Sequence, residues 1–436
     1  MHITGIIAEY NPLHLGHQYH IEQTRDLLGT DDSHYIITVL SGDFVQRGLP
    51  AIVDKHTRTR MALEAGSDLV LELPVPYALS SGEGFGFGGV SLFHQLGCVD
   101  TLSFGTEEGK LGKLTDIAKV LTFENVTNSV AAQNTTYTPY RQAYQTALKQ
   151  GLTHPAAQTQ ALAVSHPELD LSVLNGHSNN MLALEYCKAL LRLGSDIQPI
   201  TVKRMGQGYL ENTINTDTTS TQEYNFASAT AIRDTLNRIN FSNASLADST
   251  WSISVPSFVQ EALHKASMEK KLLYPDDFSL ILHYKLLTLS KEELMGYREI
   301  SPDFANKIIK NLRYFENFTQ FANLLWTKDM TYARVCRNLM SIILDIKENT
   351  WNVHQPVPYA RVLGFRRDSA ALLSQIKKSS AIPLVTKLSD AKKLLSQEAN
   401  YLLESDIKAA HVYDSVVQLK SQKMITPEMQ KQIVII

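Results

Sequence analysis

Short apolar runs rich in β-branched residues alternate with helical spacing along the first two hundred residues of the chain. The runs that predict strands are residues 3–8, 35–40, 69–73, 101–104 and 199–203. Such alternation is typical of an α/β fold in which helices cover both faces of a doubly wound parallel sheet. We therefore predict a sheet domain of this kind over residues 1–245.

The long stretch between the fourth and fifth predicted strands has a different pattern. Residues 111–194 are rich in Ala and Leu at helical spacing, with a polar segment at residues 125–138. This pattern predicts a helical insertion in the sheet domain, with a loop over the polar segment. Asn179 and Asn180 precede an apolar helix, where one is expected as the N-cap and the other is left for a ligand.

The second half of the chain predicts a mainly α-helical C-terminal domain over residues 256–436. A Ser-, Asn- and Asp-rich linker at residues 240–256 leads into it. Apolar residues recur at helical spacing over residues 278–289, 303–314 and 332–346. A short α/β-like stretch follows at residues 362–365 and 382–386.

Composition restricts the class of protein. The chain has 436 residues, of which 44% are hydrophobic and 19% charged, as in globular proteins of two or three domains. Its widely separated Cys98, Cys187 and Cys336 predict neither a zinc site nor a disulfide framework, so we expect a cytoplasmic protein. Without a signal peptide or a long apolar run, export and membrane insertion are not expected. A net charge of −3 leaves nucleic-acid binding open.

Small and polar residues follow four of the predicted strands. Ligands of open α/β sheets bind beyond the carboxyl ends of the strands, so we expect these residues to converge on one cleft. They are His14 to His17, Ser41-Gly42-Asp43, Gly105-Thr106-Glu107 and Arg204. Taken singly, Ser41-Gly42 and Gly105 are better explained as turn residues than as ligand contacts.

The first of these segments carries the most specific chemistry. His14 and His17 lie three residues apart at the start of a predicted helix, so both imidazoles reach one phosphate. Imidazole N–H groups stabilise the charge that develops when the α-phosphate of ATP is attacked, and Gly16 lets the backbone approach the nucleotide. The alternative is that both are ordinary surface histidines of a βα loop.

A second candidate phosphate site lies near residue 230. Ser228, Thr230 and Arg233 place two hydroxyl groups and a guanidinium at the first turn of a predicted helix, which suits pyrophosphate. The alternative is a plain Ser or Thr N-cap with a solvated Arg233. The pairing of this motif with the upstream histidines is more specific than either motif alone.

Together these motifs resemble the HxGH nucleotidyltransferase-like superfamily and, within it, the bacterial tRNA(Met) cytidine acetate ligase family. The resemblance covers most of the chain. It rests on residues 9–17, 41–48 and 226–233, with Asn179-Asn180, Lys203-Arg204, residues 331–334 and residues 363–365.

The resemblance implies a ligation in two steps. Acetate attacks the α-phosphate of ATP, giving acetyladenylate and pyrophosphate. The N4 amine of the wobble cytidine of elongator tRNA(Met) then takes the acetyl group, giving N4-acetylcytidine and AMP. Mg²⁺ is expected as the ion that accompanies ATP, without a dedicated set of protein ligands for a metal.

The same resemblance implies the site residues. His14 and His17 are the predicted catalytic residues, and the superfamily motif adds Ser228, Thr230 and Arg233 near the β- and γ-phosphates. The predicted ATP site otherwise comprises Ile7, Ala8, Glu9, Tyr10, Asn11, Pro12, Leu13, His14, Leu15, Gly16, His17, Gln18, Tyr19, His20, Gly105, one or both of Asn179 and Asn180, and Arg204.

Basic residues of the second half are candidates for contacts with tRNA phosphates, although each is also explained as a solvated charge. One departure from the family weakens this hypothesis locally, because Lys328 is followed by Asp329 and Met330 where the family has a basic pair. The candidates are Arg334, Arg337, Arg361, Arg366, Arg367, Lys377 and Lys378.

Two other functions remain open from the sequence. One is a small-molecule adenylyltransferase that acts on a phosphorylated cofactor precursor. The large helical second half of this chain is unusual for that class. The other is a non-catalytic RNA-binding scaffold, which has no physical reason to retain all six motif residues. The spacing identifies no residue of an acetate pocket and no oligomeric state.

Overall fold

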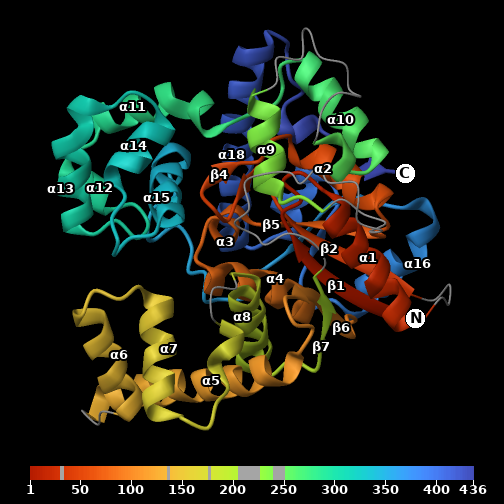
Figure 1. Cartoon of the computed structure of the whole chain (residues 1–436). Coiled ribbons are helices and arrows are strands. Elements are labelled where there is room, and N and C mark those ends of the chain that lie inside the picture. Colours follow the sequence, from red (N-terminus) through yellow and green to blue (C-terminus); the bar gives the residue numbers. More distant parts are fainter. Residues whose placement is uncertain (30–33, 135–137, 175–177, 205–225, 239–250) are drawn as a thin grey trace, which may run out of the picture.

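The centre of the molecule is a mostly parallel sheet. The computed structural model describes residues 1–29, 34–134, 138–174, 178–204, 226–238 and 251–436. The strand order is β10-β8-β5-β2-β1-β6-β7, with β9 paired to β8 and only the β5–β8 pair antiparallel. Among these strands, Figure 1 labels β5, β2, β1, β6 and β7. The strands are β1 His2–Ala8, β2 His34–Ser41, β5 Leu69–Leu73, β6 Thr101–Thr106, β7 Gln198–Lys203, β8 Ala360–Phe365, β9 Leu384–Val385 and β10 Val434–Ile435.

All five predicted strands are present, and the predicted doubly wound parallel fold is confirmed. Side chains of a strand alternate between its faces, so Ile3 and Ile6 of β1 enter two different apolar cores. One core contains side chains of α1 Leu15–Leu28, α2 Lys55–Glu64, α9 Ala229–Arg238 and α10 Ser257–Met268. The other contains side chains of α4 Gly82–Leu96, α5 Leu111–Asn134, α8 Ser178–Leu193 and α16 Ala370–Ser379.

The position of the functional site follows from the strand order. β1 pairs with β2 on one side and with β6 on the other, so the sheet is extended from β1 in both directions. Such a switch point leaves a crevice beyond the carboxyl ends of the two central strands. Here that crevice lies beyond Ala8 of β1 and Thr106 of β6.

The predicted insertion is helical, but the loop predicted within it is wrong. α5 continues to Asn134, so residues 125–134 are helical, while residues 135–137 lie outside the described part. Residues 125–134 contain neither Gly nor Pro, the two strongest helix breakers, and the next Pro is Pro139 at the start of α6. The insertion continues with α6 Pro139–Lys149, α7 His154–Ser165 and the 3₁₀ helix η1 Leu171–Leu174.

The second half forms a helical lobe and then returns to the sheet (Figure 1). The lobe has its own core, which also takes in Phe44, Leu79 and Tyr413. Its helices are α11 Ser279–Thr288, α12 Lys291–Met295, α13 Pro302–Asn311, α14 Phe318–Leu325 and α15 Tyr332–Leu344. Most of the predicted linker, through residue 250, lies outside the described residues.

The remaining elements are a short hairpin and further helices. Two strands, β3 Phe44–Val45 and β4 Leu49–Pro50, form a separate antiparallel hairpin. Within the described residues, no helix combines the length and the apolar character needed to cross a membrane. The others are α3 Val75–Ala78, α17 Ala391–Leu394, α18 Gln397–Ser421, η3 Ser252–Ser254, η4 Pro275–Phe278, η5 Leu312–Tyr314, η6 Arg367–Ser369, η7 Leu388–Asp390 and η8 Glu428–Gln430.

Four buried charges join the two halves of the chain. The Lys55 ammonium lies 2.7 Å from a carboxylate oxygen of both Glu72 and Glu428. Arg361 of β8 forms ion pairs with the same two carboxylates. At 4% exposed, Arg361 is held inside the protein, so its predicted contact with RNA is wrong. Lys431 also lies 3.3 Å from a Glu428 oxygen, so Arg361 is one of three cations among the described residues that face these two carboxylates.

We expect Arg361→Met to lower the free energy of unfolding by about 3–5 kcal/mol, because it leaves a buried negative charge uncompensated. Urea denaturation measures the change. Arg367→Met is the matched control, since Arg367 lies two residues beyond the same strand and is exposed. Equal unfolding midpoints for the two variants would contradict the structural role of this network.

Candidate active site

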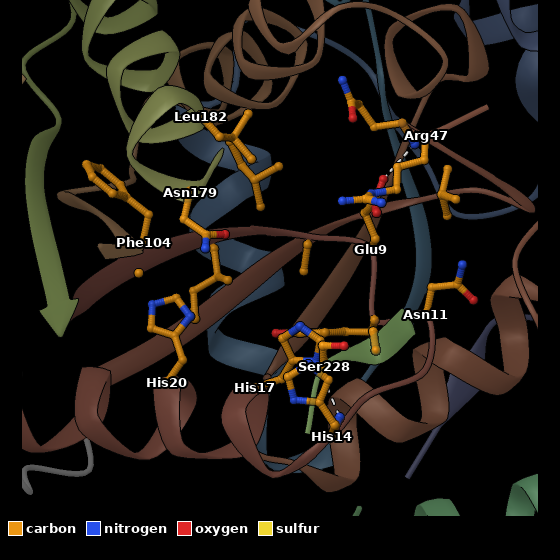
Figure 2. Close-up of a pocket in the computed structure, with 18 of the residues that line it drawn as sticks. Glu9, Asn11, His14, His17, His20, Arg47, Phe104, Asn179, Leu182 and Ser228 are labelled. Carbon is orange, nitrogen blue, oxygen red and sulfur yellow. Dashed lines mark hydrogen bonds between the residues drawn. The ribbon is translucent and has the colours of Figure 1, made fainter. Parts of the chain in front are cut away.

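A cavity occupies the crevice at the switch point. It encloses about 1220 Å³ of empty space, counting its open mouth. Its walls come from the ends of β1, β6 and β7, the starts of α1, α8 and α9, and the β3–β4 hairpin (Figure 2).

His14 and His17 form a stacked pair in this cavity. His14 is the N-cap of α1, and its backbone N–H donates to Nδ1 of His17 at 3.3 Å. The two rings stack with centroids 3.7 Å apart and planes 20° from parallel. Since Nδ1 of His17 accepts this bond, the proton of the neutral ring is on Nε2. His14 is only 6% exposed, so the alternative of an ordinary surface histidine is wrong.

Gly16 has a role that the sequence did not predict. A Cβ at this position would lie 3.0 Å from Cε1 of His14, closer than real side chains normally approach. The missing side chain therefore makes room for the His14 ring. Close approach of the backbone to the nucleotide is not needed to explain this glycine.

The histidines of the cavity are neutral at pH 7. Burial, assisted by the charge of Arg204, lowers the pKa of His14 to about 3 and that of His20 to about 4. Burial and the neighbouring His14 hold the pKa of His17 well below its ordinary value. Neutral imidazoles still donate one N–H bond each, and stacked rings of this kind would repel if both were charged.

The second phosphate motif adjoins the first. Ser228 precedes α9 and accepts a hydrogen bond from the Ala231 N–H at 3.1 Å, so it is an N-cap that also lines the cavity. Arg233 donates to the Thr230 hydroxyl at 3.1 Å and to the Asn11 carbonyl at 2.5 Å. The alternative of a merely solvated Arg233 is therefore wrong.

The two asparagines differ in their contacts. Asn179 accepts a hydrogen bond from Arg204 at 3.0 Å and donates to Glu107 at 2.7 Å, at the edge of the cavity. Asn180 is buried, where it accepts the Glu107 N–H and donates to the Val173 carbonyl. The predicted N-cap is wrong, because α8 begins at Ser178 and both amides lie in its first turn.

Most of the predicted ATP-site residues line the cavity. These are Ile7, Ala8, Glu9, Tyr10, Asn11, His14, His17, His20, Gly105, Asn179, Arg204, Ser228, Thr230 and Arg233. The structure places the other predicted residues outside the lining: Pro12, Leu13, Leu15, Gly16, Gln18, Tyr19 and Asn180.

The segment after the second strand was predicted to reach the cleft, and it does not. Asp43 accepts the Lys55 backbone N–H at 2.8 Å, and Gly42 lies against the Glu72 carboxylate. Ser41 is fully buried. Asp43 and Gly42 therefore adjoin the buried Lys55 and Glu72 instead of the cavity.

Sequence reasoning also missed residues that line the cavity. Four lie on or between the strands of the hairpin: Val45, Gln46, Arg47 and Leu49. The sequence contained one signal for these residues, because the string at residues 41–48 was part of the family resemblance. That resemblance gave Arg47 no role in the site. Four further apolar or aromatic residues come from distant elements: Phe85, Phe104, Leu182 and Tyr186.

Comparison with known proteins identifies the family. The model for the HIGH Nucleotidyl Transferase family matches residues 1–428. A tRNA(Met) cytidine acetate ligase of Clostridium perfringens is 35% identical over 438 residues, covering 98% of this chain and 99% of that protein. One from a Thermoanaerobacter species is 37% identical over 415 residues, covering 95% of each. The chain belongs to the tRNA(Met) cytidine acetate ligase family.

Solved structures agree with this membership. Thermotoga maritima TmcAL without ligand superposes with a TM-score of 0.88 at 25% identity, covering 100% of this chain and 99% of that one. The same protein bound with alpha-thio ATP gives a TM-score of 0.85 at 26% identity. The fold derived above is thus the fold of a tRNA(Met) cytidine acetate ligase.

Family membership does not make every basic residue an RNA contact. Arg337 is 8% exposed and donates to the Gln46 carbonyl at 3.3 Å, so its predicted RNA role is wrong. Arg334 forms an ion pair with Glu299 at 3.2 Å. Phe365 pairs with Leu69 at the start of β5, so Arg366 and Arg367 lie at the sheet edge opposite the cavity.

The neutral state of His14 makes the stability of this acetate ligase family member depend on pH. The folded pKa is lowered to about 3, so below pH 6.5 the unfolded chain takes up a proton that the folded chain does not. Stability from this group is therefore complete above pH 6.5 and falls by about 2 kcal/mol between pH 7 and pH 5.

We expect His14→Gln to reduce the loss of unfolding free energy between pH 7 and pH 5 by that amount, measured by urea denaturation at both pH values. His411→Gln, which removes an exposed histidine of α18, is the control. If His14→Gln and the wild type lose equal stability, a buried neutral His14 is ruled out.

Proposed function

We propose that this protein activates acetate with ATP and transfers the acetyl group to N4 of the wobble cytidine of elongator tRNA(Met). The observation that carries the proposal is the neutral, stacked His14–His17 pair, which shares one cavity with the start of α9. Membership of the family and the alpha-thio ATP bound by Thermotoga maritima TmcAL support ATP as the co-substrate.

In the first step, a carboxylate oxygen of acetate bonds to the α-phosphorus while the bond to pyrophosphate breaks. Negative charge then grows on the phosphate oxygens and on the departing pyrophosphate. His17 Nε2–H, the Thr230 hydroxyl and Arg233 are the donors suited to hold that charge. The reaction needs no protein nucleophile, because acetate itself attacks.

The nucleoside of ATP belongs on the opposite wall of the cavity. At the end of β6, Gly105 lies against the Arg204 side chain, where a Cβ would come within 3.2 Å of Cγ. Arg204 in turn donates a hydrogen bond to Asn179, and all three residues line the cavity. In Figure 2, Asn179, Phe104 and His20 lie on one side of His17 and Ser228. We propose that this side holds the adenosine.

In the second step, the cytidine N4 amine attacks the acetyl carbonyl, and the C–O bond to AMP breaks. The amine loses one proton as the C–N bond forms. We propose that residues 256–436 hold the tRNA so that its wobble base enters the mouth of the cavity. In this arrangement, four basic residues could contact only parts of the tRNA that lie far from the wobble base. They are Arg366, Arg367 and the exposed Lys377 and Lys378.

Mg²⁺ fits this site as an ion held by the phosphates of ATP. Over the part of the chain that the structure describes, no three His, Cys, Asp or Glu side chains gather as metal ligands. Glu9 already accepts the Gln46 N–H, and Glu107 accepts from Asn179. When bound, the ion would neutralise charge on the phosphate oxygens.

We expect pyrophosphate release by the purified protein with Mg-ATP to depend on acetate, and added tRNA to gain N4-acetylcytidine. Pyrophosphate assays and nucleoside mass spectrometry measure the two products. Release that instead requires a phosphorylated cofactor precursor would establish the alternative, a small-molecule adenylyltransferase, which the family comparison does not favour.

We expect His17→Asn to lower the rate of acetyladenylate formation by about 10²–10³, the usual effect of removing one such donor. The Asn oxygen retains an acceptor near Nδ1 for the His14 N–H, so the start of α1 is preserved. His17→Gln is the matched comparison, because its amide lies nearer Nε2, and it should lose less activity. Equal loss in both folded variants would contradict donation from Nε2.

A further inference from the structure

The β3–β4 hairpin brings a third cationic side chain into the cavity. Its turn, residues 46–48, carries Arg47, which lies beside Glu9 in Figure 2. Asn179, Phe104 and His20 lie across the cavity, with His17 and Ser228 between the two sides. Arg47 is therefore separated from Arg204, which belongs to the side with Asn179.

The turn that presents Arg47 is fixed by contacts on several sides. The Gln46 N–H donates to Oε1 of Glu9 at 2.6 Å, and the Gln46 side chain donates to the Ser80 carbonyl at 3.3 Å. Arg337 of α15 donates to the Gln46 carbonyl. A turn held by three separate elements positions a side chain as a binding group requires.

Gly48 closes this turn and shows how tightly it packs. Its φ of +75° lies in the left-handed region, and its N–H donates to the Val45 carbonyl at 2.8 Å. A Cβ here would lie 2.2 Å from the Arg337 backbone nitrogen. Only glycine allows the hairpin to rest directly on α15, so the place of Arg47 is set by the helical lobe.

We propose that Arg47 binds the carboxylate of acetate, an inference that rests on the proposed function. Arg47 lines the cavity at a place apart from the donors of α1 and α9 and from the pair Asn179 and Arg204. A guanidinium matches a carboxylate with two parallel hydrogen bonds. Val45 and Leu49 of the same hairpin supply apolar contacts for the methyl group.

Glu9 makes the proposed carboxylate site beside Arg47 selective for a small monoanion. Burial raises the pKa of Glu9, and the Gln46 N–H and the charge of Arg47 oppose that rise. Arg47 thus acts electrostatically inside the cavity rather than in bulk solvent. A substrate with a second carboxylate would meet the Glu9 side chain, which lies against the same turn.

The test is acetate-dependent exchange of radiolabelled pyrophosphate into ATP, which reports the first step without tRNA. We expect Arg47→Met to raise the KM for acetate by roughly 10- to 100-fold, the cost of one lost charged hydrogen-bond pair, and to leave the KM for ATP unchanged. Arg47→Lys keeps the charge beside Glu9 and should give a smaller rise. Arg60→Met, on the exposed surface of α2, is the matched control.

Other outcomes would overturn the inference in distinguishable ways. A raised KM for ATP with unchanged acetate dependence would assign Arg47 to the phosphates. Unchanged exchange with loss of N4-acetylcytidine would assign it to the tRNA. Wild-type protein without acetate-dependent exchange would reject the proposed function itself. If Arg47→Met does not fold, Arg47→Lys is the test variant. An unchanged KM for acetate in Arg47→Lys, together with binding of isotope-labelled acetate equal to that of the wild type, rejects the proposal.

Discussion

The site depends on one buried guanidinium that ties the carboxyl ends of two central strands together. Arg58 is 0% exposed, and it donates to the carbonyl oxygens of Glu9, Ser41, Gly42 and Val53. Where parallel strands end, their last carbonyl groups lose their ladder partners, and inside a protein each needs a donor. Burial lowers the pKa of Arg58, and Asp43 is the first of the charges that oppose this. With the ends of β1 and β2 fixed, the segment from Glu9 to His14 has a defined exit toward the cavity.

The same constraint links the cavity to the helical lobe. Glu9, whose carbonyl accepts from Arg58, uses its carboxylate to hold the Gln46 N–H. The Gln46 carbonyl in turn accepts from Arg337 of α15, so one path of hydrogen bonds runs from β1 to the lobe core. Below it, Lys55 and Arg361 balance Glu72 and Glu428 and fasten the C-terminal strands to the same sheet. The second half of the chain therefore shapes the ATP-side cavity as well as any RNA surface.

Local patterns predicted the parts of the structure that local chemistry determines. The five strands followed from β-branched runs, and both phosphate motifs followed from residue types at fixed spacing beside predicted helix starts. Tertiary contacts decided the rest. Arg337 and Arg361 look like surface charges in the sequence, and only packing shows that they are buried against a carbonyl and two carboxylates. The hairpin with Arg47 reaches the cavity through Glu9, 38 positions before Arg47 in the chain, which no spacing rule connects.

The arrangement of charge explains why neutral histidines suit this site. Permanent positive charge comes from arginines at separate places, Arg204, Arg233 and Arg47, whereas His14 and His17 contribute directed N–H dipoles. Burial costs a neutral imidazole much less than a charged one, so the pair packs as stacked rings in the wall. In the proposed first step, charge that develops on a phosphate would meet donors already in place. Burial keeps the imidazoles neutral, and the hydrogen bond from the His14 backbone to Nδ1 of His17 fixes the direction of the His17 Nε2–H group.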